Sequence, residues 1–239
     1  MKRNTIDFEQ YFLRNKALIA ELVGHSNIRK NDTVIDIGAG SGAITSVLSR
    51  KARRVIAIEP DSIAFVKLSS NLKTRENVEA ICIDFLDFKL PDFPYKVFAN
   101  IPFSLSSRII KKLVLSDNPP KAIYLIVQKQ FAQKLVLSSK HFHSALGVGI
   151  APWWTARIRR PLKRTDFSPS PNVDSVLLEL KLINDMNMPY RDISEFMKFV
   201  EDIYSAKRKF PKNIYKTKKP SEIPLDEWIE AFLNRKRLA

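Results

Sequence analysis

Short runs of β-branched and aliphatic residues recur along the first two-thirds of the chain, separated by segments with helical periodicity. Several runs are apolar throughout, which is typical of parallel strands buried on both faces. The predicted strands are Thr33–Ile37, Arg54–Glu59, Val78–Ile83, Lys96–Asn100, Ala122–Val127, Trp153–Arg160 and Ser175–Leu182. The predicted helices between them are Ala43–Arg50, Asp61–Leu72, Ser106–Leu115 and Lys129–Leu137. This alternation predicts an α/β fold with a doubly wound, Rossmann-like sheet.

The pattern changes after Leu182. Helical periodicity continues at Ile193–Tyr204 and Leu225–Asn234, and the stretch that joins these two segments is basic and punctuated by proline. We therefore expect a cofactor-binding catalytic domain in residues 1–182 and a small, helical, basic domain in residues 183–239.

The charge of the chain narrows the class of partner. Lysine and arginine number 40 against 25 acidic residues, a formal net charge of +15, whereas solubility needs a net charge on the order of 2–8. A nucleic acid accounts for this excess better than a basic surface without a partner, because its phosphates bind cations independently of sequence. An anionic membrane is a third reading, but no basic amphipathic helix supports it.

Other features of composition set the expected environment. No apolar run approaches the ~20 residues that span a bilayer, and no signal peptide is apparent at the start. The single cysteine, Cys82, stands in an apolar run and is expected to be a buried thiol. We expect a cytoplasmic monomer with no membrane attachment and no bound metal.

A glycine-rich loop, Asp36–Gly42, follows the first predicted strand and opens a helix. Glycines there allow a ligand to approach the backbone closely, and Glu59 ends the next strand, where a carboxylate can accept both hydroxyls of a ribose. The pattern predicts an adenosine-containing cofactor at the carboxyl ends of the strands. Because Gly38, Gly40 and Ala43 also fit the dinucleotide fingerprint, a nicotinamide oxidoreductase remains an alternative.

Two later positions add polar groups at the same edge. Asp84 follows the third strand, where its carboxylate can accept a hydrogen bond from an adenine amine. The tetrapeptide Asn100–Phe103 ends the fourth strand, and its proline stiffens the turn. The Asn100 side chain and the Ile101 carbonyl can then accept hydrogen bonds from one amino group, while Phe103 offers a stacking face for a base.

Together these motifs resemble those of the rRNA adenine dimethyltransferases, and most closely the erythromycin-resistance (Erm) type. The resemblance covers nearly the whole chain, and its motifs are Gln10–Leu13, Asp36–Gly42, Arg53–Glu59, Asp84–Leu86, Asn100–Phe103, Tyr124–Lys129 and Phe167–Ser175. It implies S-adenosylmethionine as cofactor and ribosomal RNA as partner, with methyl transfer to the N6 amine of an adenine. For the Erm type, the RNA is 23S rRNA and the consequence is macrolide resistance.

The resemblance also implies a role for each matching residue. The cofactor would contact Gln10, Tyr11, Leu13, Gly38, Gly40, Glu59, Asp84 and Asn100, and the catalytic motif would be Asn100, Ile101, Pro102 and Phe103. The chain departs from the family at Tyr11, where asparagine usually helps to hold the methionine end of the cofactor. It also has Phe103 where tyrosine is more common, which retains the stacking face.

No charged general base is evident beside Asn100, so positioning and electrostatic stabilisation are the expected sources of catalysis. The target base must be flipped or presented in a loop. Two alternatives stay open besides the oxidoreductase. One is a small-subunit rRNA adenine dimethyltransferase, and the other is a non-catalytic nucleic-acid-binding protein on the same scaffold, for which Tyr11 is the best argument.

Three basic clusters are candidates for RNA binding. They are Lys207, Arg208 and Lys209, with Lys212, Lys216, Lys218 and Lys219 after them; Arg157, Arg159, Arg160, Lys163 and Arg164; and Arg50, Lys51, Arg53 and Arg54.

Overall fold

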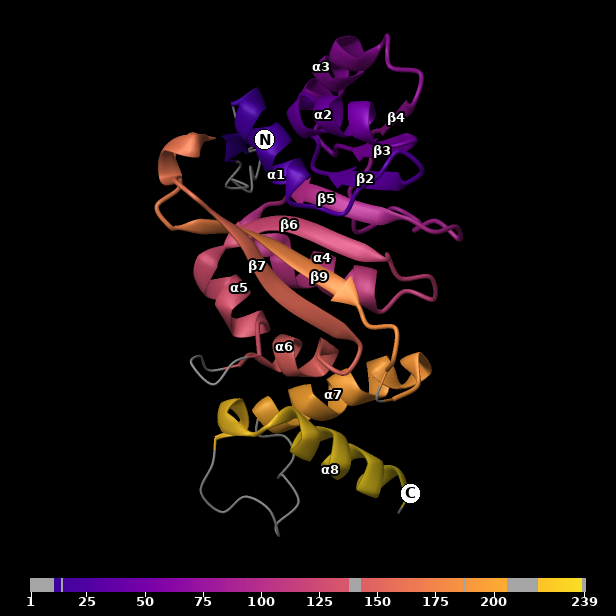
Figure 1. The fold of residues 1–239 in the computed structure, drawn as a ribbon, viewed down its shortest axis with the longest axis vertical. Coiled ribbons are helices and arrows are strands. Elements are labelled where there is room, and N and C mark those ends of the chain that lie inside the picture. The colour runs from indigo at the N-terminus through magenta and orange to yellow at the C-terminus, as the bar shows by residue number, and fades with distance from the viewer. Residues whose placement is uncertain (1–10, 14, 138–142, 187, 206–218, 238–239) are drawn as a thin grey trace, which may run out of the picture. The chain divides into compact units, whose positions relative to one another are not determined.

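The computed structural model describes residues 11–13, 15–137, 143–186, 188–205 and 219–237. Within these residues, a seven-stranded sheet has the order β4-β3-β2-β5-β6-β9-β7, and β1 and β8 form a separate two-stranded sheet (Figure 1). The strands are β1 (Phe12–Leu13), β2 (Thr33–Ile37), β3 (Arg54–Ile58), β4 (Val78–Ile81), β5 (Lys96–Asn100), β6 (Ala122–Gln128), β7 (Trp154–Leu162), β8 (Phe167–Ser168) and β9 (Ser175–Leu182). The α-helices are α1 (Lys16–Gly24), α2 (Ala43–Lys51), α3 (Ser62–Leu72), α4 (Ser106–Val114), α5 (Lys129–Leu135), α6 (Ala145–Ile150), α7 (Ile193–Tyr204) and α8 (Leu225–Arg237).

Five neighbouring strands, β4, β3, β2, β5 and β6, pair in parallel. The register places Ile37 beside Ile58, and Asn100 beside Ile126. The carboxyl ends of these strands therefore meet at one edge of the sheet, as expected for a doubly wound fold. The predicted α/β class is confirmed.

One face of this sheet is covered by α1 and α2. The buried side chains of α1, including Ile19 and Leu22, pack in one cluster with Val34, Phe98 and Tyr124 of the strands. Leu68 and Leu72 of α3 form a second cluster with Ala57 of β3 and Ala39. Helix α1 was not predicted, although Asn15 caps it by accepting hydrogen bonds from the amides of residues 17 and 18.

The short strands β1 and β8 pair antiparallel, with Phe12 opposite Ser168 and Leu13 opposite Phe167. Phe167 belongs to the segment that the sequence placed in a loop between the last two strands. This pairing ties residues 12 and 13 to the sheet unit, and so fixes the segment that leads into α1.

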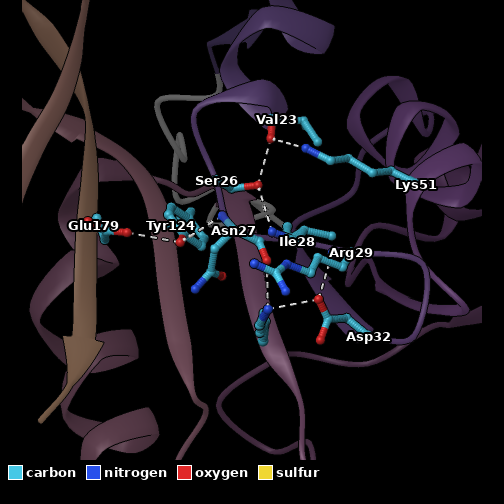
Figure 2. Close-up of polar contacts among 10 residues, drawn as sticks. Val23, Ser26, Asn27, Ile28, Arg29, Asp32, Lys51, Tyr124 and Glu179 are labelled. Carbon is cyan, nitrogen blue, oxygen red and sulfur yellow. Dashed lines mark hydrogen bonds and ion pairs between the residues drawn. The ribbon is translucent and has the colours of Figure 1, made fainter.

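A polar network holds the loop between α1 and β2 (Figure 2). The Tyr124 hydroxyl donates to Glu179 Oε1 at 2.9 Å and accepts from the Asn27 amide at 3.0 Å. The buried ammonium of Lys96 donates to Asn27 O at 2.8 Å and to Asp32 Oδ2 at 2.7 Å. The loop is thus anchored to the amino ends of β5 and β6, opposite the edge that carries Asn100.

The chain divides into two compact units, residues 1–129 with 158–179, and residues 130–157 with 180–239. In the second unit α7 packs on α6, and the rings of Trp153, Phe196, Phe199, Trp228 and Phe232 form an edge-to-face aromatic cluster. The predicted boundary after residue 182 lies near the change at 179–180, but residues 130–157 also join the second unit. Whether residues 183–239 form a domain of their own stays a prediction.

The prediction for Cys82 was wrong, because its side chain is exposed. The apolar run around it suggested a central strand, but β4 is at the edge of the sheet and ends at Ile81. An edge strand has a neighbour on one side only, and residues beyond its end reach solvent.

Candidate functional site

A pocket of about 130 Å³ opens at the carboxyl edge of the parallel strands. It is lined by Tyr11, Phe12, Ile37, Gly38, Glu59, Pro60, Asp84, Phe85, Leu86, Asn100, Ile101, Pro102, Phe103, Leu105 and Ile109. The pocket brings together most of the residues that the sequence singled out, although they come from the end of β5, from the segment before β1 and from the segments that follow β2, β3, β4 and β5. Its wall is mainly apolar, with a carboxylate at each of two positions and an amide at a third.

The glycine loop bends sharply between β2 and α2. Gly38, Gly40 and Gly42 all have positive φ angles, of 68°, 57° and 93°. The amides of Gly38 and Ala39 donate to Ile58 O at 2.8 and 3.0 Å, so the loop is fastened to the end of β3. A methyl group added at Gly40 would lie 3.2 Å from the Phe12 ring. The loop and Phe12 of β1 are thus in close contact, and the positive φ of Gly40 disfavours a side chain at that position.

Glu59 is buried directly after β3. Its Oε2 accepts from the Gly40 amide at 2.7 Å and its Oε1 accepts from the Asp61 amide at 2.9 Å. Burial raises the pKa of Glu59, while these two backbone hydrogen bonds oppose the change. The carboxylate is therefore held rigidly at the pocket wall, with lone pairs left on both oxygens for a ligand.

Asp36, the first residue of the glycine-loop motif, is the group that sequence reasoning left without a role. It is 1% exposed, and its Oδ2 accepts from the Thr45 hydroxyl at 2.6 Å. Burial raises the pKa of Asp36 to about 7, with a smaller contribution from the charge of Glu59. Its Oδ1 has no hydrogen-bond partner among the described residues. A carboxyl in an otherwise apolar strand was the signal that could have identified it.

Asp84 lies in a turn beyond the end of β4, which is at Ile81. The sequence predicted a longer strand, with Asp84 at its end. Its Oδ1 accepts from the Leu86 amide at 2.8 Å. The next residue, Phe85, is buried and also lines the pocket, and Lys112 lies over its ring. The turn thus presents a carboxylate beside an aromatic face, which suits a planar heterocycle with an amino group.

The segment after β5 has the rigid form that the sequence predicted. The strand ends at Asn100, and Pro102, with φ −56° and ψ 129°, directly precedes a single 3₁₀ turn over Phe103–Leu105. The Leu105 amide donates to Pro102 O at 3.0 Å, and the Ser106 hydroxyl donates to Phe103 O at 2.9 Å. These bonds hold the backbone on both sides of Phe103.

Tyr11 lies against this motif. Asn100 Nδ2 donates to the Tyr11 backbone carbonyl at 2.5 Å. The Tyr11 and Phe103 rings are 5.5 Å apart between centroids, with an interplanar angle of 34°. Tyr11 and Phe12 therefore line one side of the pocket, with Tyr11 against the Asn100–Phe103 motif.

Two of the predicted cofactor contacts, Leu13 and Gly40, do not line this pocket. Gln10 falls outside the described residues. Leu13 is buried in the core cluster that includes Leu18 and Ile19, and it does not line the pocket. Its contribution is to anchor β1 rather than to contact a ligand there.

The basic clusters differ in what their side chains contact. Lys207, Arg208, Lys209, Lys212, Lys216 and Lys218 lie outside the described residues. On β7 and the turn after it, three arginines pair with carboxylates: Arg159 with Glu179 at 3.8 Å, Arg160 with Glu21 at 2.5 Å, and Arg164 with Asp174 at 3.1 Å. Arg54 pairs with Glu79, and Lys51 donates to Val23 O. Much of the charge that the sequence grouped together is thus already opposed by acidic side chains. The role of the β7 cluster in RNA binding stays a prediction.

Known proteins are similar to this chain in sequence and in fold. Residues 1–224 match the family model described as ribosomal RNA adenine dimethylase. An rRNA adenine N-6-methyltransferase of Bacillus licheniformis is 32% identical over 194 residues, which is 80% of this chain and 67% of that protein. A probable ribosomal RNA small subunit methyltransferase A of Methanosarcina mazei is 31% identical over 236 residues, 96% of this chain and 86% of that one.

Solved structures agree on the fold. The 23S rRNA methyltransferase ErmE superposes with a TM-score of 0.78 at 22% identity, covering 93% of this chain and 98% of the other. A dimethyladenosine transferase from Plasmodium falciparum gives a TM-score of 0.79 at 20% identity, covering 95% and 98%. Among the described residues, no helix is both long and apolar enough to cross a bilayer.

Proposed function

Because the chain belongs to the ribosomal RNA adenine dimethylase family, we propose that it methylates the N6 amine of an adenine in 23S rRNA. The protein is an rRNA adenine methyltransferase that uses S-adenosylmethionine. We propose the choice of 23S rRNA, the residues that act in the reaction and the consequence for the cell. A nicotinamide oxidoreductase and a non-catalytic binding protein, which the sequence left open, do not agree with the family.

The donor set of the pocket fits S-adenosylmethionine. Glu59 supplies carboxylate oxygens for the ribose hydroxyls, and Asp84 with Phe85 supplies an acceptor and a ring face for the adenine. Gly38 leaves the loop free of a side chain where the backbone borders the pocket, and Gly40 in the same loop is proposed as a second contact. When bound, the cofactor supplies an electrophilic sulfonium methyl group.

The other residues act on the target amine. An adenine amine is a weak nucleophile because its lone pair is delocalised into the ring. Since Asn100 Nδ2 is bonded to Tyr11 O, its Oδ1 is the atom left to accept from the amine. The Ile101 carbonyl is the second proposed acceptor. Two acceptors favour the pyramidal amine and stabilise the positive charge that develops on it. Phe103 offers the face on which the flipped base stacks, a contact worth about 1–3 kcal/mol.

The bond between Asn100 and Tyr11 is the observation on which this assignment rests. It fixes which end of the Asn100 amide faces the pocket, and no charged base is needed for the reaction. We propose that the protein acts as a cytoplasmic monomer on rRNA and that its product confers macrolide-type resistance.

The 16S rRNA of the small ribosomal subunit is the second candidate substrate. The relatives include both a methyltransferase named for adenine N-6 and several named for the small ribosomal subunit. The Asn-Ile-Pro form at residues 100–102 favours 23S rRNA.

Purified, unmodified 16S and 23S rRNA should each be incubated with the protein and with S-adenosylmethionine labelled in its methyl group. Label in 23S rRNA alone, mapped to one adenine by primer extension, is the expected result. Label in 16S rRNA alone would overturn the subunit assignment, and label in neither would overturn the proposed reaction.

A further inference from the structure

A second concavity lies on the other side of the glycine loop. It is a groove of about 630 Å³ lined by residues of α1 and α2 and by the last residues of α3. Helices α1 and α2 pack against each other in the first unit, beside α3 (Figure 1). The groove takes one face from each helix: Lys16, Ala20 and Val23 at helical spacing on α1, and Ala43, Val47 and Arg50 on α2.

The groove carries positive charge without acidic side chains. Lys16, Arg50 and Lys51 line it, and none of its described lining residues is an aspartate or glutamate. Ser41, Ser46 and Asn71 add polar groups along the rim. This differs from the β7 cluster, where three arginines already pair with carboxylates.

The three cationic side chains of the groove differ in their contacts. Lys51 Nζ donates to Val23 O at 2.9 Å, so it joins α2 to the end of α1. Lys16 and Arg50 are exposed, and no ion pair to a described residue is found for either. Their charges are therefore the ones available to a ligand. The floor between them is made of small apolar side chains, Ala20, Ala43 and Val47, which leave room for a chain to lie in the groove.

The groove and the catalytic pocket share the loop after β2. Gly38 lines the pocket, whereas Ser41 and Gly42 line the groove. Lys16 is close in sequence to Tyr11, which also lines the pocket. A strand that inserts one base over Phe103 would thus have adjoining backbone within reach of the groove.

We propose that this groove binds backbone phosphates of the RNA strand next to the target nucleotide, with Lys16 and Arg50 as the phosphate contacts. The proposal rests on the proposed function for its choice of ligand. The shape of the site favours a nucleic acid strand over an acidic protein surface, because a groove admits a narrow chain and a flat protein surface does not fit into it. An electropositive groove that follows a strand is how proteins bind single-stranded nucleic acid without reading its sequence.

The test uses the full chain and the double variant Lys16→Gln/Arg50→Gln. The control, Lys89→Gln/Lys121→Gln, removes the same charge at two exposed lysines that do not line the groove. Binding of fluorescent poly(U) is measured by anisotropy from about 50 to about 200 mM salt. Poly(U) contains no adenine, so the readout does not depend on the catalytic pocket. Circular dichroism checks that each variant is folded.

Each phosphate contact to a single strand contributes about 0.7 to the slope of log K against log salt. The groove variant should therefore lose about 1.4 from that slope, and the control should keep the wild-type slope. The charge-reversal variant Lys16→Glu/Arg50→Glu should bind more weakly still. An unchanged slope in both groove variants, or an equal loss in the control, would overturn the proposal.

Methylation of rRNA by the wild-type protein is measured separately. If the wild type binds poly(U) through the groove but methylates no rRNA, the groove stands and the proposed function fails. If the wild type methylates rRNA while the groove variants bind poly(U) normally, the proposed function stands and the groove proposal fails.

Discussion

The side-chain amide of Asn100 donates to the backbone carbonyl of Tyr11, which belongs to a segment far away in sequence. An asparagine amide can turn over and exchange its donor and acceptor ends at little cost in space. The carbonyl of Tyr11 accepts only, so it selects the orientation in which Asn100 Oδ1 remains for another donor. The segment that contains Tyr11 thereby sets which end of the Asn100 amide faces the pocket.

Replacing Asn100 with alanine should abolish methyl transfer and leave RNA binding nearly intact. Loss of one preorganised acceptor commonly lowers kcat by about 10²–10³-fold, and here the same side chain also ties down Tyr11. Single-turnover methylation of rRNA measures the rate, and filter binding measures the affinity for RNA. Normal turnover in this variant would remove Asn100 from the mechanism.

Tyr11→Phe and Tyr11→Ala separate the backbone of residue 11 from its ring. Both variants retain the carbonyl that Asn100 contacts, but only phenylalanine retains the ring against Phe103. An aromatic pair is worth about 0.5–1.5 kcal/mol beyond the area it buries. We expect Tyr11→Ala to lower kcat/KM for rRNA several-fold and Tyr11→Phe to have a smaller effect. Equal losses in the two variants would show that the ring contact is unimportant.

Gly40→Ala should weaken cofactor binding. The left-handed backbone at Gly40 costs a residue with Cβ roughly 1–2 kcal/mol, and the new methyl would lie 3.2 Å from the Phe12 ring. Gly24→Ala is the matched control, because a methyl there meets nothing within 4 Å. Isothermal titration with S-adenosylhomocysteine should detect the loss for Gly40→Ala alone. Comparable affinities in the two variants would argue against a close approach at Gly40.

The buried carboxyl of Asp36 should make stability depend on pH. Its pKa is raised from 3.8 to about 7 in the folded protein, so the folded state holds this proton more tightly than the unfolded chain does. The free energy of unfolding should therefore fall as pH rises from about 4 to about 7, by up to roughly 4 kcal/mol. Asp36→Asn should remove this component and raise the melting temperature at pH 8 relative to wild type.

Thermal melts of both proteins between pH 5 and pH 8 measure the effect, with the difference between them shrinking toward low pH. Parallel pH profiles would mean that Asp36 stays ionised when the protein is folded.

Lys96→Met should destabilise the fold. The ammonium of Lys96 is buried between Asn27 O and Asp32 Oδ2, and the variant leaves both oxygens without this donor. Breaking a buried pair from one side costs about 3–5 kcal/mol, and partial exposure of Asp32 places the expected loss at the lower end. A double-mutant cycle with Asp32→Asn, followed by urea unfolding, isolates the pair. Additive effects would show that the two groups do not interact.

Strands of the large sheet could be predicted because each one is encoded by a local run of residues. Thr33–Ile37, Lys96–Asn100 and Ser175–Leu182 are found with the predicted bounds. The glycine loop and Asn100–Phe103 were also identifiable, since strand ends at one edge of a parallel sheet converge. The pocket follows from these local signals together.

What the sequence did not reveal depends on partners that are distant along the chain. Strands β1 and β8 have two residues each, and they are strands only because Phe12 and Phe167 belong to segments that meet. The same applies to Arg160, whose partner Glu21 lies on α1. A cluster of arginines in sequence says nothing about the acids that fold beside it. The sequence grouped Arg50 and Lys51 with Arg53 and Arg54, and it did not show that Lys16 lies with them in one groove.

The pairing of Leu13 with Phe167 sets a temporal order for this protein during its own synthesis. A ribosome delivers the amino-terminal segment early, but the strand that fastens it emerges only after most of the sheet has been made. Until then the pairing that fixes residues 12 and 13, next to Tyr11, is absent. A nascent chain should thus become competent for catalysis late, once residue 168 has left the exit tunnel.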